Sequence, residues 1–199
     1  RSVPYGGIFS DNLYVDNYQE QTVILPPPDD WTFLDPNLGG YVMGSQTQIE
    51  LNGTGTDYNA QAWRSTGYTL DDLDQASFDF KVDVKDSKAF IGIATNSDIQ
   101  QRFALVDADG VLYAQIFRIG AVPQHNTFPL LDATQFKADV WYRVTITVDD
   151  TNGSLIEVEE RDDPSVSGSY RDTGGLLATG RDWVVLGATQ NGILTMDNY

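Results

Sequence analysis

Apolar and polar residues alternate with a period of two along most of the chain. Phe and Val alternate with Asp and Lys over residues 78–85, and Tyr, Val and Ile alternate with Arg and Thr over residues 142–148. This pattern is typical of strands that bury one face in a core and expose the other to water. Further strands are predicted at 48–51, 60–64, 89–94, 102–106, 111–119, 155–160 and 183–188. No segment has an apolar stripe of helical period and length, so the sequence predicts an all-β fold.

Turn-forming pairs separate the predicted strands. They include Asn52-Gly53, Asp109-Gly110, Asn152-Gly153 and Asn191-Gly192, and such pairs favour the tight turns that join antiparallel strands. Many short strands joined in this way predict two antiparallel sheets packed face to face.

The sequence contains one boundary and one terminal repeat. Pro26-Pro27-Pro28 marks the boundary, because proline lacks the backbone donor that a sheet needs. The final Asp197-Asn198-Tyr199 repeats Asp16-Asn17-Tyr18, and two copies of one closing strand predict a repeat. We therefore expect residues 1–21 to end a preceding repeat or to be a strand exchanged with a neighbour. Residues 22–199 would form the sandwich domain, either as one module of an array or as a filament subunit that assembles by β-strand addition.

Charge and composition narrow the set of partners. The chain has 29 Asp and Glu against 12 Lys and Arg, a net charge of −17 at pH 7, which repels nucleic acids and anionic lipid surfaces. It contains no cysteine, which excludes disulfides, thiolate metal sites and cysteine nucleophiles. No apolar run approaches about 18 residues, so membrane insertion is not expected.

Several segments together carry a resemblance to a known family: Asp29-Asp30-Trp31, Phe90-Ile91-Gly92-Ile93, Trp141-Tyr142-Arg143-Val144 and Met196-Asp197-Asn198-Tyr199. Their order, with strands between them, resembles a concanavalin A-like (laminin-G-like) jelly roll over residues 22–199. Such domains recur in bacterial surface repeat proteins and in carbohydrate-active enzymes. The resemblance implies a two-sheet antiparallel jelly-roll sandwich that is extracellular or at the cell surface.

The sharpest catalytic candidate is the segment Glu157-Val158-Glu159-Glu160-Arg161-Asp162. Side chains two residues apart on a strand share a face, so Glu157 and Glu159 should project together, and a bulge would bring Asp162 alongside them. The segment resembles the E-x-D-x-x-E strand of laminarinase-type glycoside hydrolases, in which two carboxylates act as nucleophile and acid/base. It departs from that motif at the second and third acidic positions, and we favour a solvated strand face with no catalytic role.

The single histidine gives no catalytic alternative. His125 falls in a predicted loop over residues 123–127, and no G-x-S-x-G segment is present to supply a nucleophile for a Ser-His-Asp triad.

Aromatic residues offer a platform for a glycan, because a sugar ring has an apolar face that stacks on an aromatic ring. Tyr113, Gln115 and Phe117 alternate along one predicted strand, and Trp63 and Arg64 lie on another. These five are the predicted ligand-binding residues, with ordinary core packing as the alternative.

Calcium is the metal that the acidic composition favours, because it requires only carboxylate and carbonyl oxygens. In related jelly rolls a structural calcium commonly joins the N-terminal segment to an Asp of the last strand. The resemblance therefore implies a calcium site at Asp197, with Asp29 or Asp30 as partner ligands. The alternative is a capped turn or a solvated side chain at each position.

These observations predict a non-catalytic extracellular jelly-roll module, a structural or adhesive repeat with glycans and neighbouring repeats or subunits as candidate partners. One alternative is a glycoside hydrolase or polysaccharide lyase that uses Glu157 and Glu159. The other is the filament subunit described above.

Overall fold

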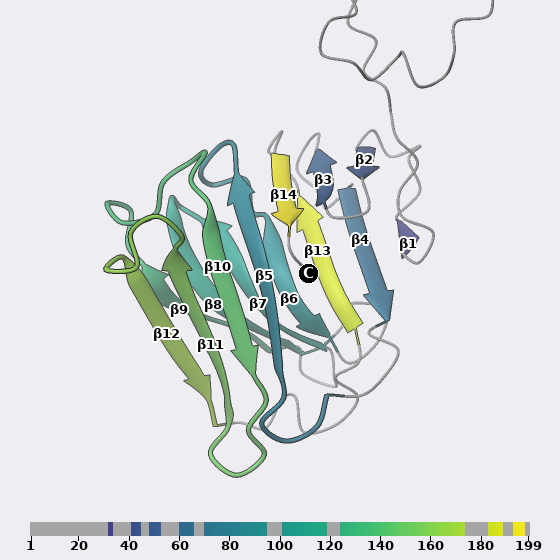
Figure 1. Cartoon of the computed structure of the whole chain (residues 1–199), viewed down its shortest axis with the longest axis vertical. Helices are drawn as coiled ribbons and strands as arrows, with labels where there is room; N and C mark the ends of the chain where they lie inside the picture. The colour runs from purple at the N-terminus through teal and green to yellow at the C-terminus, as the bar shows by residue number, and fades with distance from the viewer. Residues whose placement is uncertain are drawn as a thin grey trace, which may run out of the picture.

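The computed structural model describes residues 32–33, 41–44, 48–52, 60–65, 70–94, 101–118, 124–173, 183–188 and 193–197, with side chains described for 50–51, 70–94, 103–116, 126–173 and 193–197. These residues form fourteen strands (Figure 1): β1 (Thr32–Phe33), β2 (Tyr41–Gly44), β3 (Gln48–Asn52), β4 (Ala60–Ser65), β5 (Gln75–Val82), β6 (Phe90–Ala94), β7 (Gln101–Ala108), β8 (Val111–Arg118), β9 (Gln124–Leu131), β10 (Tyr142–Thr147), β11 (Ser154–Glu160), β12 (Ser167–Asp172), β13 (Trp183–Ala188) and β14 (Ile193–Asp197). In the described ranges, no helix has the length and apolar character needed to cross a membrane.

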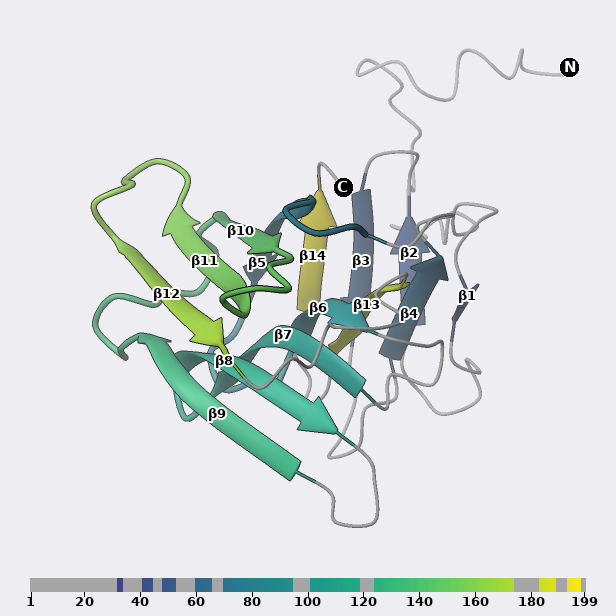
Figure 2. The same ribbon diagram turned by 90° about the horizontal axis from the view of Figure 1, so that it is seen from below.

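The strands form two sheets that pack face to face. The first sheet has the order β1-β4-β13-β6-β7-β8-β9, and the second sheet has the order β12-β11-β10-β5-β14-β3-β2. Figure 2 shows the two sheets as separate layers, and neighbouring strands are antiparallel, as between β10 and β11. Neighbours along a sheet are often far apart in the chain, as β5 and β14 are. The predicted all-β, two-sheet antiparallel jelly-roll sandwich is confirmed.

Inward-facing residues of the two sheets meet in one core. Val144 of β10 and Ile156 of β11 are completely buried, whereas Arg143 and Glu157, their neighbours in the sequence, are exposed. Burying an aliphatic side chain contributes about 1.5–3 kcal/mol relative to leaving it in water. The alternation seen in the sequence therefore fixes which face of β10 and β11 points away from the core.

Tyr142, the first residue of β10, packs in the core against two phenylalanine rings. The ring of Tyr142 lies 5.8 Å from that of Phe80 and 5.4 Å from that of Phe136, measured between centroids. Its hydroxyl accepts a hydrogen bond from the Lys137 backbone N–H at 2.9 Å and donates to the Gln135 carbonyl at 3.3 Å. The polar atom of this fully buried side chain is thus paired, which avoids the cost of an unsatisfied buried group.

The two sheets meet at one side, where β9 lies against β12. Phe128 stacks on Tyr170 with ring centroids 3.9 Å apart. Gly168 lies so close to β9 that a Cβ atom there would collide with the Leu130 carbonyl oxygen. A residue with a side chain would force the backbones apart, so glycine at this position allows β12 to pack against β9.

The sequence pattern predicts neither of these two edge strands. His125, predicted to lie in a loop, belongs to β9 and pairs with Phe117 of β8. β9 contains Pro129, and β12 reads Ser-Gly-Ser-Tyr-Arg-Asp, so neither strand alternates between apolar and polar residues. Both lie at sheet edges, where proline and polar residues are tolerated.

Two of the predicted turns are present, and one predicted segment is not described. Asp109 and Gly110 connect β7 to β8 with φ values of 53° and 72°, both in the left-handed region that Asn, Asp and Gly favour. Asn152-Gly153 connects β10 to β11. The segment of residues 1–21 lies outside the described residues, so its exchange or repeat role stays a prediction.

Candidate functional site

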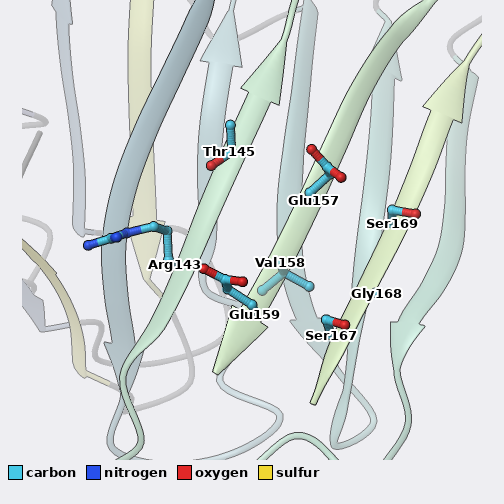
Figure 3. A pocket seen from close by; sticks show the side chains of 8 residues that line it. All are labelled: Arg143, Thr145, Glu157, Val158, Glu159, Ser167, Gly168 and Ser169. Atoms are coloured by element: carbon cyan, nitrogen blue, oxygen red, sulfur yellow. The ribbon is translucent and has the colours of Figure 1, made fainter. Parts of the chain in front are cut away.

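A polar pocket of about 420 Å³ lies on the outer face of the second sheet (Figure 3). Three neighbouring strands, β10, β11 and β12, form its floor. The lining comprises Arg143, Thr145, Glu157, Val158, Glu159, Ser167, Gly168 and Ser169. It therefore presents two carboxylates, three hydroxyls and one guanidinium, and none of these lining residues is aromatic.

The register of the strands brings these residues together. Directly paired residues on adjacent antiparallel strands lie on the same face, with Cβ atoms about 4.5–5.5 Å apart. Two adjacent cross-strand rows cross the pocket: Arg143, Glu159 and Ser167 in one, and Thr145, Glu157 and Ser169 in the other. Residues eight to sixteen positions apart in the chain thus become direct neighbours.

The two carboxylates of the pocket are available to a ligand. Glu157 and Glu159 are both exposed, and neither has a hydrogen bond or ion pair within the described part of the chain. Figure 3 shows them projecting from the same face of β11. An ionised carboxylate accepts hydrogen bonds at two oxygens, so the pair presents four acceptor atoms to the pocket.

The guanidinium of Arg143 points away from these carboxylates and over β5 (Figure 3). Its Nε and Nη2 donate to Asp79 Oδ1 and Oδ2 at 2.9 and 3.2 Å. Asp79 is only 1% exposed although it lies on the outer face of the sheet, and its Oδ2 is also 3.3 Å from Nη1 of Arg161. The hydrogen bonds and charge of Asp79 raise the pKa of Arg143 above its usual value. Arg143 is therefore a permanent cation whose charge is offset by Asp79.

Trp141, immediately before β10, is flanked by two cations. Lys81 Nζ lies 5.3 Å from the centroid of the Trp141 ring, and Arg161 Cζ lies 5.8 Å from it. Lys81 belongs to β5 and Arg161 follows β11, the strands on opposite sides of β10. The ring already makes cation–π contacts within the protein, and it does not line the pocket.

The structure brings together two of the three catalytic candidates. Glu157 and Glu159 share the pocket, as the i, i+2 spacing predicts. Asp162 lies in the turn between β11 and β12 and is not part of the lining. The pairing of β11 with β12 shows no bulge that would carry Asp162 toward the pair. The pocket can bind hydroxyl or ammonium donors, and no third carboxylate of the described residues lines it.

The predicted aromatic platform lies on the first sheet, away from the pocket. Trp63 and Arg64 belong to β4, and Tyr113, Gln115 and Phe117 belong to β8. Trp63 and Gln115 share one cross-strand row, but β13, β6 and β7 lie between them, a separation of about 19 Å at normal strand spacing. Tyr113 is half-buried and Gln115 is 2% exposed. The side chains of the other three lie outside the described ones, and a ligand role for these five residues stays a prediction.

The predicted calcium site is only partly described. Asp197 lies in β14, paired with Asp79 of β5 and Gln48 of β3. Asp29 and Asp30 lie outside the described residues. Within the described ranges, no group of three His, Asp or Glu residues is placed to hold a metal ion. A calcium ion joining Asp197 to the N-terminal segment stays a prediction.

Sequence reasoning did not identify the partners of the two glutamates. Arg143 and Thr145 were recognised only as the polar face of a strand, and Ser167 and Ser169 lie in the unpredicted β12. The connection between β10 and β11 spans residues 148–153. A two-residue turn at Asn152-Gly153 would place Arg143 opposite Asp162, whereas the longer connection places it opposite Glu159, so local turn chemistry does not predict this register.

No family model and no curated protein matches the sequence. Among solved structures, the chain is similar to an endo-β-1,4-glucuronan lyase from the fungus Trichoderma reesei, with a TM-score of 0.54 and 13% identity over 86% of this chain and 90% of that chain. It is also similar to the carbohydrate-binding module CBM66 from Bacillus subtilis, with a TM-score of 0.52 and 11% identity over 85% of this chain and 92% of that chain.

A third similar structure is the CBM2 module of an evolved Dit from Lactobacillus casei BL23 phage J-1, with a TM-score of 0.50 and 14% identity over 90% of this chain and 94% of that chain. The chain spans 41% of the length of a further similar structure, that of an HCR/D mutant. At these identities the likeness shows the fold alone. This β-sandwich is one that carbohydrate-binding modules and a polysaccharide lyase share.

Proposed function

We propose that this chain is a non-catalytic glycan-binding module whose ligand occupies the pocket on β10, β11 and β12. The observation that carries the proposal is the pair of exposed carboxylates without protein partners, Glu157 and Glu159, in a pocket with three hydroxyl side chains. Carboxylates accept charge-assisted hydrogen bonds from sugar hydroxyls, and the hydroxyls of Ser and Thr both donate and accept. The fold shared with two carbohydrate-binding modules supports the same function.

The dimensions and chemistry of the pocket suit a short polar ligand. Its volume of about 420 Å³ falls within the range of about 300–1,000 Å³ that is usual for small-molecule sites. Because none of the lining residues is aromatic, recognition would depend on hydrogen bonds to ring hydroxyls and not on stacking. An extracellular setting as a structural or adhesive repeat is part of the same proposal.

A glycoside hydrolase is the second candidate, because Glu157 and Glu159 lie on one face of one strand in the same pocket. A retaining enzyme needs two carboxyl groups about 5–5.5 Å apart, one on each side of the scissile bond. We expect no hydrolysis of β-glucans, galactans or uronates. Turnover of any of them that disappears in a Glu157→Gln or Glu159→Gln variant would establish the enzyme instead.

A glycan array followed by calorimetric titration tests the binding proposal. We expect the wild type to bind at least one oligosaccharide and the Glu157→Gln, Glu159→Gln variant to lose that binding. Asp162→Asn is the matched control, because it removes an exposed carboxylate from the same chain segment outside the pocket lining. Equal binding by wild type and the double variant would place the glycan elsewhere and overturn the proposal for this pocket.

A further inference from the structure

The charges around the pocket are arranged asymmetrically. Arg143 is the one cation among the lining residues. Its Nε and Nη2 atoms both donate hydrogen bonds to Asp79. The buried Asp79 pairs with both Arg143 and Arg161, so these three side chains together carry one net positive charge. Glu157 and Glu159 carry two negative charges and have no hydrogen bond or ion pair among the described residues, although Glu159 attracts Arg143 at longer range. A ligand entering the pocket therefore meets a net negative field from two nearby carboxylates.

We infer that the ligand of this pocket is a protonated amino sugar, and that Asp79 sets this preference by holding Arg143 away from Glu157 and Glu159. This inference rests on the proposed glycan-binding function and names its ligand class. Like-charge juxtaposition disfavours uronates, and a neutral sugar gains only hydrogen bonds. An ammonium group gains attraction from both carboxylates.

The spacing of the two carboxylates suits an ammonium group. Residues two apart on an antiparallel strand have Cα atoms about 7 Å apart, and both side chains are long enough to converge on a group held between them. An ammonium group has three N–H donors, so two can bond Glu157 and Glu159 while the third faces solvent or a hydroxyl. The hydroxyls of Ser167 and Ser169 lie in the same pocket for the sugar's own hydroxyls, next to that of Thr145, which shares a hydrogen bond of 3.0 Å with Ser77.

Asp79 is a positioning residue, because it acts on the pocket only through Arg143. Arg143 and Glu159 are directly paired across β10 and β11 and interact electrostatically. With Asp79 absent, the guanidinium would be free to swing toward Glu159 and neutralise it. Arg161 also pairs with Asp79, from the other side of the carboxylate. The buried Asp79 thus holds the guanidinium of Arg143 over β5, outside the space between Glu157 and Glu159.

The test compares three β-linked tetrasaccharides by calorimetric titration: one of glucosamine, one of N-acetylglucosamine and one of glucuronic acid. The titrations are made at about pH 6, above the ordinary pKa of Glu and below that of an amino group. We expect the glucosamine oligomer to bind at least ten times more tightly than its acetylated counterpart and the uronate not to bind. Added salt should reduce the ratio, because it screens the charges.

Variants separate the parts of the inference. Asp79→Asn should lower the amine-to-acetyl affinity ratio to below about threefold, and Asp79→Asn with Arg143→Gln should restore it because the mispairing cation is gone. Arg143→Gln alone should change the ratio by less than twofold, and the Asp162→Asn control should leave it as in the wild type. If Asp79 had only a structural role, adding Arg143→Gln to Asp79→Asn would not restore the affinity ratio.

The outcomes keep this inference apart from the proposed function. If no oligosaccharide of any charge binds, the proposed function fails and this inference fails with it. If glycan binding depends on Glu157 and Glu159 but shows no preference for the glucosamine oligomer, the proposed function stands and the amino-sugar inference is overturned. If Asp79→Asn does not fold, Arg143→Gln decides the role of Asp79. A severalfold rise of the ratio in that variant would show that Arg143 already neutralises the pocket, and would overturn that role.

Discussion

The inner and outer faces of β10 and β11 are built from alternate residues of the same two strands, and they differ in what determines them. On the inner face, Val144 and Ile156 are completely buried and packed in the core. On the outer face, Glu157 and Glu159 are exposed without protein partners. The fold depends on the first set and tolerates almost any polar residue in the second. We therefore expect this unpartnered, like-charged pair to contribute little to stability, and the proposed function assigns it to ligand binding.

The carboxylates of the molecule show the same difference. Asp79 is buried and paired with two arginines, and Asp107 is buried and accepts hydrogen bonds from the backbone N–H groups of Asp86 and Ser87. Each of these groups is satisfied by the protein itself. Glu157 and Glu159 are not. Replacing Asp79 or Asp107 should therefore cost stability, with an added effect of Asp79 on binding through Arg143, whereas replacing Glu157 or Glu159 should affect binding alone.

The largest expected effect is on the inner face. Replacing the fully buried Ile156 by Ala should lower the free energy of unfolding by about 3 kcal/mol, since such truncations lose burial and leave a cavity. Urea unfolding measures it. Ser169→Ala, on the exposed face of the next strand, is the control and should stay within about 0.5 kcal/mol of the wild type. A cost below about 1 kcal/mol for Ile156→Ala would show that the inner face does not determine the fold as argued.

Gly168 belongs to both regions, because it lines the pocket and packs β12 against β9. Gly168→Ala would make a Cβ atom collide with the Leu130 carbonyl oxygen, and the forced backbone shift should cost about 1–3 kcal/mol, as overpacking usually does. Thermal melting measures the loss. An unchanged melting temperature would mean that the contact between β9 and β12 is looser than described.

Acid titration separates a carboxylate whose pKa is governed by burial from one whose pKa is governed by hydrogen bonds. Burial raises the pKa of Asp107, and the backbone N–H of Asn152 lowers that of Asp149. A carboxyl group whose pKa is lowered in the native state stabilises the fold above the ordinary Asp pKa of about 3.9, and this stabilisation is lost as pH falls. A group whose native pKa is raised stabilises the fold at low pH instead, and this stabilisation is lost as pH rises. Compared with the wild type, Asp149→Asn should therefore lose less stability on acidification and Asp107→Asn more. NMR titration should find the Asp107 midpoint above that of Asp149, and the reverse order would refute this assignment.

The smallest effect on stability is expected at the pocket itself. Glu157→Gln and Glu159→Gln should each change the free energy of unfolding by less than about 0.5 kcal/mol, because both side chains are exposed and neither has a hydrogen bond or ion pair to lose among the described residues. Relief of repulsion between the two could make the change slightly stabilising. Measured by urea unfolding, a loss of more than about 1 kcal/mol would mean that the pair supports the fold, and would remove the main argument for a ligand.

The parts of the fold that could be predicted are those that rest on local pattern. The strand at 142–148 and the shared face of Glu157 and Glu159 follow from the period of two, and they are present. β9 and β12 were missed because edge strands need not alternate, as Pro129 and Gly168 show. The contact of Arg143 with Asp79 joins residues 64 positions apart, and such a contact depends on sheet order, which local pattern does not contain.

The central claim is that the ligand binds to the outer face of β10, β11 and β12. An NMR titration of the isotope-labelled chain with the glucosamine tetrasaccharide tests it most directly, because each backbone amide reports on its own position. The account predicts shifts concentrated at Thr145, Glu157, Glu159, Ser167 and Ser169. Shifts confined instead to β8, around Tyr113 and Gln115, would contradict it and would place the binding site on the opposite sheet.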